Sequence, residues 1–150
     1  MSSNVYYFSS FSDLLNYIDG EINALEENLQ GLKQRYEVVK ARAEKLRKLE
    51  KALEELVGEK ISTLNEVDFM GLRVVINARG IDELKVLEDA IASQEDTLSA
   101  LKRVRDVLKK LHDSLESSVG TGGLTIIVQT RFNIPVRILL REAEEQVYGG

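Results

Sequence analysis

His112 is the one side chain of this sequence whose ordinary chemistry suits proton transfer near neutral pH. A general base acts on a nucleophile held beside it, and a metal ion needs several ligands. The chain has one histidine and no cysteine. We therefore expect His112 to be a surface or helix-seam residue, with no catalytic role, no bound metal and no cofactor.

The glycine-rich run 120–123, Gly-Thr-Gly-Gly, invites comparison with loops that bind phosphate. Such a loop follows a strand, opens a helix and ends in Lys-Ser or Lys-Thr. This run follows a helical pattern, precedes a strand pattern and lacks that ending, so it predicts a linker or hinge. The carboxylates are interleaved with bases and form neither a calcium loop nor an HExxH motif. We therefore expect that the protein is not an enzyme.

The apolar residues that would position any site recur in steps of three and four over a long stretch, which is the heptad pattern of a coiled-coil helix. They are Ile18, Ile22, Leu25, Leu29, Leu32, Tyr36, Val39, Ala43 and Leu46. The pattern predicts a helix over about 12–57, with Ser10 or Ser12 as its cap. Its phase shifts after Leu46, where Leu49, Leu53 and Leu56 continue it.

A second helix is predicted over about 82–118, capped by Asp82. Its seam is marked by seven apolar residues: Leu84, Leu87, Ile91, Leu98, Leu101, Leu108 and Leu115. Gln94, Arg105 and His112 occupy seam positions where polar groups can fix the register.

Short β-prone runs surround the helices. Residues 4–8 and 124–129 read as strands, and the connector 58–80 contains two more, at 67–69 and 72–77, around a Met70-Gly71 turn. The segment 136–148 has both strand and helix spacing. Within the C-terminal part 119–150, we expect a strand that leads into a short helix from Arg141 onward.

Blocks of charge indicate that the two helices pair antiparallel, because flanking charges select orientation. With Val57 placed opposite Asp82, Lys51 would lie beside Glu88 and Lys110 near Glu26. The predicted fold is therefore α+β: one domain, residues 1–150, built on a long antiparallel coiled-coil hairpin with strands in the connector and near the termini. The unfilled seams, and the strand 124–129 as an exposed edge, predict at least a homodimer.

Composition limits the partners. A net charge of −5 argues against nucleic acid, and no apolar run approaches the length that spans a bilayer. The opening residues lack the features of a signal peptide, so we expect a cytoplasmic protein.

The connector carries a group of large apolar residues that we identify as a candidate partner-binding site: Val67, Phe69, Met70 and Leu72. Two interpretations stay open, a local hairpin packed on the end of the bundle or a surface for a partner protein. Two long helices joined by a short β segment resemble the architecture of prefoldin-like chaperones, although this chain adds about 30 residues after the second helix. The expected function is a non-catalytic oligomeric scaffold or adaptor. The alternative is a chaperone-like holder of apolar client segments, which the resemblance implies.

Overall fold

A computed structural model describes residues 3–57, 65–76 and 80–143 of the chain. The elements follow the order β1 (Ser3–Phe8), α1 (Phe11–Val57), β2 (Asn65–Phe69), β3 (Leu72–Ile76), α2 (Gly80–Ser118), β4 (Leu124–Arg131) and β5 (Ile134–Glu142). The mixed helix and sheet content confirms the predicted α+β composition. The chain divides into two compact units, residues 1–27 with 94–150 (the sheet unit) and residues 28–93 (the connector unit). That both form one domain stays a prediction.

The ends of both helices follow from local hydrogen bonding. The Ser10 side chain accepts a hydrogen bond of 3.0 Å from the amide of Asp13, so Ser10 is the predicted cap of α1. The helix α2 begins at Gly80, two residues before the predicted start, which places Asp82 in its first turn. At its other end, the amides of Val119 and Gly120 both donate to the Leu115 carbonyl, and Gly120 has a φ of 78°.

Three antiparallel strands form the sheet of the sheet unit, in the order β1-β4-β5. The strand β4 therefore lies at the centre, with Tyr6 paired to Val128 on one side and Ile138 paired to Val128 on the other. This corrects the expectation that 124–129 is an exposed edge, and removes that argument for a dimer. The predicted helix from Arg141 is also wrong where it can be judged: β5 stays paired with β4 through Glu142, and residues 144–150 lie outside the described part.

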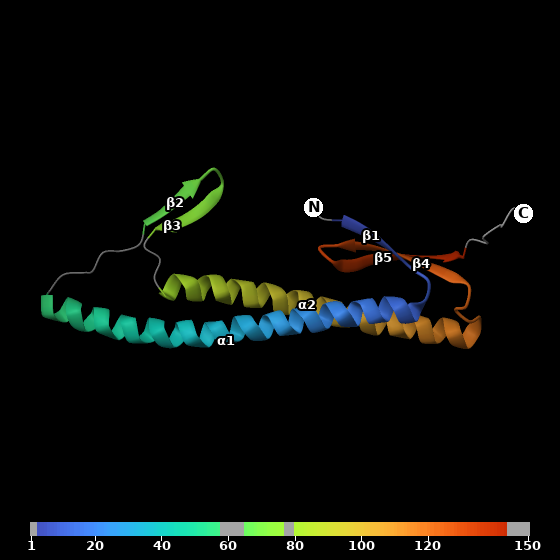
Figure 1. The fold of residues 1–150 in the computed structure, drawn as a ribbon, viewed down its shortest axis with the longest axis horizontal. Coiled ribbons are helices and arrows are strands. Elements are labelled where there is room, and N and C mark those ends of the chain that lie inside the picture. The colour runs from blue at the N-terminus through green and yellow to red at the C-terminus, as the bar shows by residue number, and fades with distance from the viewer. Residues whose placement is uncertain (1–2, 58–64, 77–79, 144–150) are drawn as a thin grey trace, which may run out of the picture. The chain divides into compact units, whose positions relative to one another are not determined.

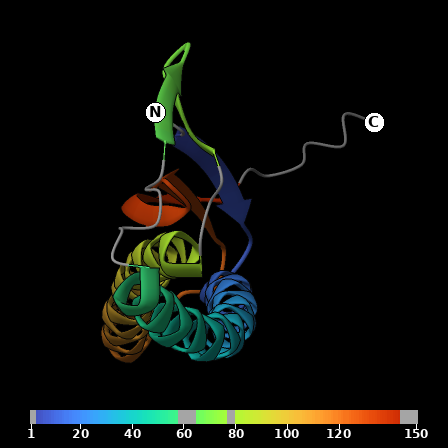
Figure 2. The same ribbon diagram turned by 90° about the vertical axis from the view of Figure 1, so that its left-hand side faces the viewer.

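The sheet unit has a closed core. Figures 1 and 2 show the sheet on one side of the segments of α1 and α2 that belong to this unit. Alternate residues of β4 face these helices. The core joins the start of α1, the end of α2 and the inner face of β4, and its buried members are Phe11, Leu14, Ile18, Ile22, Leu101, Leu108, Ile126 and Val128. Burial of this set explains why the unit's sheet and helices hold together.

Among the residues described, fewer side chains are buried in the connector unit than in the sheet unit. The buried apolar residues of the connector unit, among those described, are Leu29, Val39 and Leu87. Tyr36 hydrogen-bonds Glu88 and Ala43 lies against Gly80, so the later residue of α1 meets the earlier residue of α2, and these segments run antiparallel. Among the residues described, neither helix is both long enough and apolar enough to cross a membrane.

The expected helix register is wrong in both units. Glu88 contacts Tyr36 instead of Lys51, and in the sheet unit Glu26 contacts Lys102 instead of Lys110. The cause is that α2 does not begin opposite the end of α1. A Cβ atom added to Gly80 would lie 3.2 Å from the Ala43 Cβ atom. The start of α2 therefore lies against Ala43, where two small residues allow a close approach.

Candidate functional site

The β2–β3 hairpin holds the four residues predicted to bind a partner. The strands pair Phe69 with Leu72 and Val67 with Val74. Of the four predicted residues, Val67 and Phe69 belong to β2, Leu72 begins β3, and Met70 lies in the turn between the two strands. The side chains of Val67 and Val74 lie outside the described part. The structure thus brings the four predicted positions together at one hairpin tip.

The tip is apolar and exposed to solvent. The exposed fractions are 63% for Phe69, 92% for Met70 and 66% for Leu72. Exposure forgoes stabilisation, since full burial of one large apolar side chain contributes ~1.5–3 kcal/mol to the free energy of unfolding. The choice between a local hairpin packed on the end of the bundle and a surface for a partner protein stays a prediction.

The turn itself is unusual for the residue that it contains. Met70 and Gly71 have φ values of 53° and 89°. Positive φ at both central residues defines the type I′ turn, in which Asn-Gly is strongly preferred. Methionine has a Cβ atom that makes this backbone conformation costly. The residue at position 70 is therefore not the one that turn formation favours.

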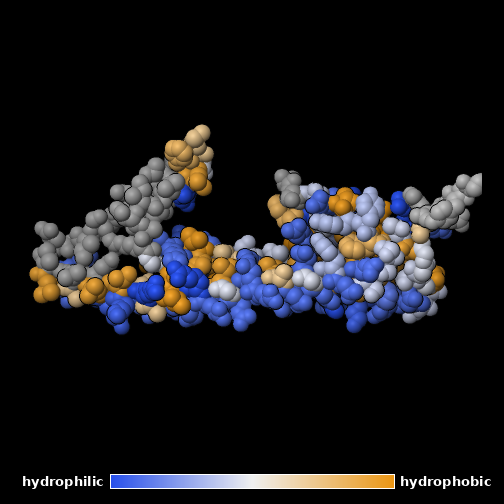
Figure 3. Space-filling model, viewed as in Figure 1, coloured by the Kyte–Doolittle hydropathy of each residue, from blue (hydrophilic) through white to orange (hydrophobic). Residues whose placement is uncertain are grey.

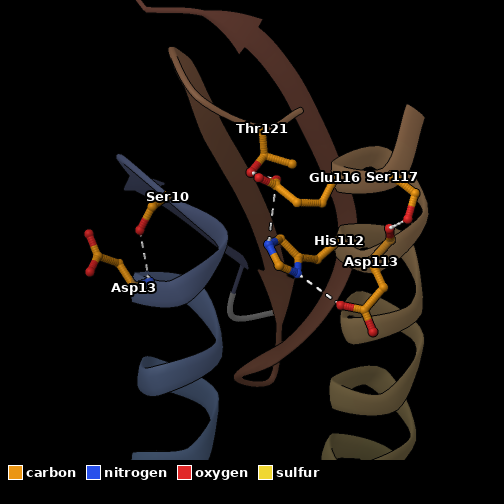
Figure 4. Close-up of polar contacts among 7 residues, drawn as sticks. All are labelled: Ser10, Asp13, His112, Asp113, Glu116, Ser117 and Thr121. Carbon is orange, nitrogen blue, oxygen red and sulfur yellow. Dashed lines mark hydrogen bonds and ion pairs between the residues drawn. The ribbon is translucent and has the colours of Figure 1, made fainter. Parts of the chain in front are cut away.

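His112 lies near the end of α2 among carboxylates (Figure 4). Its Nδ1 atom is 3.1 Å from Asp113 Oδ1, and its Nε2 atom is 3.8 Å from Glu116 Oε2. Its ring also contacts Phe11, with the ring centroids 5.4 Å apart. The expectation of a seam-edge histidine agrees with this partly buried position.

The hydroxyl groups near His112 donate their hydrogen bonds to atoms other than those of the imidazole ring. Thr121 donates to the Glu116 carboxylate, and Ser117 donates to the Asp113 carbonyl (Figure 4). A nucleophile would need to hydrogen-bond the histidine itself. Within the described part of the chain, no three histidine or acidic side chains gather as a metal site would require. The described contacts of this cluster therefore join the last turns of α2 to Thr121, and they contain neither a nucleophile hydrogen-bonded to His112 nor a set of metal ligands.

A polar cleft of about 530 Å³ opens on the helices of the sheet unit. It is lined by Asp19, Ile22, Asn23, Lys102, Arg105 and Asp106. Its cations are already paired, since Arg105 binds Asp19 and Lys102 lies 3.2 Å from Glu26. The hydrogen bond from Arg105 to Asp19 raises the pKa of Arg105. These pairs join α1 to α2, which makes the cleft a poor site for an anion.

A third feature was missed by sequence reasoning, namely the end of α1 beyond Ala43. Leu46, Leu49 and Leu56 are exposed there. The phase shift after Leu46 was the available signal, but the incorrect register placed α2 opposite these residues.

Comparison with known proteins adds no assignment to these features: no protein-family model matches the chain, and no match is found among curated proteins or solved structures.

Proposed function

We propose that this protein is a non-catalytic oligomeric scaffold or adaptor whose β2–β3 tip binds a partner protein. The observation that carries the proposal is the exposure of Phe69, Met70 and Leu72 at one turn. Contiguous exposed apolar groups on soluble proteins are typical of interaction sites.

In this proposal α1 and α2 form an antiparallel coiled-coil hairpin. The contacts within each unit support that arrangement. Lys102 with Glu26 and Arg105 with Asp19 lie in the sheet unit, and Tyr36 with Glu88 lies in the connector unit. Across the three pairs, the residue of α1 moves from 19 to 26 to 36 while its partner in α2 moves from 105 to 102 to 88, which is the order of an antiparallel pair. Such a hairpin would serve as a rigid support for the tip.

The decisive variant is Met70→Asn. Asn-Gly is the preferred sequence for a type I′ turn, so the substitution keeps or improves the turn while it removes the apolar side chain. We expect an unchanged or slightly higher melting temperature together with weaker partner binding. The matched control is Phe132→Asn, because Phe132 also has a positive φ and an exposed side chain, in the turn between β4 and β5.

Partner binding can be read by site-specific photocrosslinking. A photoreactive phenylalanine analogue at position 69 should crosslink to a discrete protein in an extract of the source cell. Met70→Asn should reduce this crosslinking, and the same analogue at position 132 should not give the product. Equal products from positions 69 and 132, or no product from position 69, would contradict the proposed site.

The second candidate function is a chaperone-like holder, which the same tip favours because its exposed turn residues offer apolar surface and little polar specificity. A holder should suppress aggregation of reduced, unfolded lysozyme, and Met70→Asn should weaken that effect. An adaptor with one partner should leave the aggregation unchanged. The lysozyme assay thus separates the two functions.

A further inference from the structure

The strand β5 lies at one edge of the sheet of the sheet unit. The strand order is β1-β4-β5, and among the described strands β5 pairs with β4 alone. A strand at the edge of a sheet presents N–H and C=O groups to the outside, which is the arrangement that accepts a further strand. The pairing of β5 with β4 is regular from Arg137 to Glu142, because the register shift of the pair lies before Arg137. We call the side of this stretch that faces away from β4 the far edge of β5.

Alternate residues of this stretch carry positive charge on the outer face of the sheet. Every second residue of β4 is buried from Ile126 to Thr130, so the residues between them, and their partners on β5, lie on the face away from the core. The partners on β5 are Arg137, Leu139 and Arg141. All three side chains are exposed.

The outer face contains no carboxylate among the residues that the structure describes. Glu142 is the acidic residue of the described strands of this sheet, and by alternation it belongs to the opposite face. Figure 3 shows hydrophobic (orange) and hydrophilic (blue) atoms side by side over the sheet. The whole chain has a net charge of −5, whereas this face is positive. Charge complementarity therefore favours an acidic partner.

Apolar surface lies between the two arginines. On the outer face, Leu139 is 53% exposed. On the inner face, Leu140 is 42% exposed, although Ile138 beside it packs against the core. The edge of the sheet thus leaves apolar surface on both faces, and a further strand would cover it with apolar side chains of its own.

A strand that complements the far edge of β5 has a defined pattern. Its residues opposite Arg137 and Arg141 would be acidic and the three between them apolar, since opposite charges and apolar side chains stabilise cross-strand pairs. Antiparallel pairing of residues 137–141 with the same stretch of a second copy would set Arg137 opposite Arg141 at both ends. Like charges directly opposite each other destabilise a sheet. The charges therefore favour an acidic strand over a second copy of β5.

We propose that the far edge of β5 binds an extended acidic segment of a partner protein, which adds to the sheet as a further strand with the pattern acid-apolar-apolar-apolar-acid. In complexes of this kind, backbone hydrogen bonds give affinity and alternate side chains give specificity. The site belongs to the sheet unit and goes beyond the proposed function, which concerns the β2–β3 tip. An adaptor with both sites would join two different partners.

The first test measures binding of a fluorescent peptide to the full chain by anisotropy. The peptide contains Glu-Val-Val-Val-Glu between flexible Gly-Ser ends, and its matched control has Lys in place of both Glu residues. The Glu peptide should bind about tenfold more tightly, because two cross-strand charge pairs change from attraction to repulsion in the control. Equal affinities, or no binding of the Glu peptide at millimolar concentration, would overturn the proposal.

The second test exchanges a charge on the protein. Arg137 is changed alone, because Arg141 also takes part in an interaction within the chain. Arg137→Glu should weaken binding of the Glu peptide about fivefold and strengthen binding of a Glu-Val-Val-Val-Lys peptide. The control is Lys110→Glu, an equal change of charge at an exposed position of α2, which should leave both affinities unchanged. If Arg137→Glu weakens both peptides alike, the proposed charge pairing is wrong.

The third test determines whether the backbone of the peptide takes part. Successive residues of a strand direct their N–H groups to opposite edges. N-methylation of the second and of the third residue, in separate peptides, therefore blocks opposite edges. One methylated peptide should lose binding and the other should retain it. Equal binding of the two would indicate side-chain contact without an added strand and would contradict the proposal. Tighter binding of polyuridylate than of the Glu peptide would also contradict it, since the arginines and Tyr7 would then serve single-stranded nucleic acid.

Discussion

Both the sheet unit and the connector unit expose large apolar residues, but among the described residues only the sheet unit has a buried cluster shared by a sheet and two helical segments. In the sheet unit, Leu14, Ile18 and Ile126 are almost fully removed from water between a sheet and two helical segments. In the connector unit, large apolar residues of the β2–β3 tip and of the end of α1 beyond Ala43 face solvent. The first distribution stabilises a fold. The second leaves apolar surface in contact with solvent, which our proposed function assigns to the binding of a partner.

The turns of the two β-hairpins are alike in backbone conformation, whereas the sheets that carry them differ. Both have positive φ at two successive residues, Met70-Gly71 in one and Phe132-Asn133 in the other. The β4–β5 hairpin belongs to a sheet whose centre is buried, whereas β2 and β3 form a sheet of two strands. Two strands alone are marginally stable in water. The β2–β3 hairpin therefore has more to gain from a bound partner.

The largest expected effect tests the difference in burial between the units. Leu14→Ala removes a fully buried side chain from the core of the sheet unit and should lower the free energy of unfolding by ~2–5 kcal/mol. Val38→Ala, on the same helix in the connector unit, truncates an exposed side chain and should change it by no more than ~0.5 kcal/mol. Denaturant unfolding of both variants measures the contrast. Similar losses would show that the two units do not differ in this way.

The helices were predictable from the sequence because their signals are local. Heptad spacing and the Ser10 cap predict α1, and the strand-forming run 124–129 predicts most of β4. The candidate tip was predictable for the same reason, since Phe69, Met70 and Leu72 are close together in the chain.

The errors concern contacts between distant residues. A heptad seam repeats, so it admits several registers. The observed one depends on Ala43 and Gly80 meeting, which no local pattern reveals. In the same way, Val136 and Leu140 satisfy both helix and strand spacing. The segment forms a strand because it pairs with β4, a contact between distant residues that overrides local propensity. The same error in register hid the exposure of Leu46, Leu49 and Leu56 at the end of α1.

A smaller effect is expected from two tyrosines, one in each unit. Burial raises the pKa of Tyr17 to about 12, helped by a hydrogen bond with Tyr6 and the charge of Glu21. In the connector unit, the hydrogen bond from Tyr36 to Glu88 raises the pKa of Tyr36. Since the unfolded chain loses these protons near pH 10, the folded state binds more protons above that pH. Stability that is fully present below pH 10 should therefore fall as the pH rises toward 12.

The two causes can be separated by ultraviolet titration of tyrosinate. Glu88→Gln should lower the pKa of Tyr36 and leave that of Tyr17 unchanged, because only Tyr36 contacts that carboxylate. Tyr17→Phe should remove the latest titrating tyrosine and reduce the loss of stability between pH 10 and 12. If Tyr17 titrates near pH 10 in the wild-type protein, its packing against Tyr6 and Phe8 is not maintained in solution.

The smallest expected effects come from one ion pair in each unit. Asp19 and Arg105 make two contacts, Nε with Oδ1 and Nη2 with Oδ2, at a partly buried position of the sheet unit. Arg35 and Glu83 make a more exposed pair in the connector unit, with Nη2 and Nε at 2.9 and 3.0 Å from the same oxygen. Exposed pairs contribute ~0.2–1 kcal/mol, and salt screens them.

Double-mutant cycles should give different coupling free energies for these two ion pairs. The cycle of Asp19→Asn with Arg105→Gln should give the larger coupling free energy of the two, because a two-contact pair that is held beside a packed core needs little additional ordering. The cycle of Arg35→Gln with Glu83→Gln should give a few tenths of a kcal/mol at most, since both side chains retain more contact with water. Raising the salt concentration should reduce both coupling free energies, and that of Arg35 with Glu83 should become undetectable first.

Equal coupling free energies in the two units would contradict this comparison. The helices of the connector unit would then be held as firmly as those beside the closed core. Its exposed leucines and its tip would belong to a rigid surface instead of a loosely supported one.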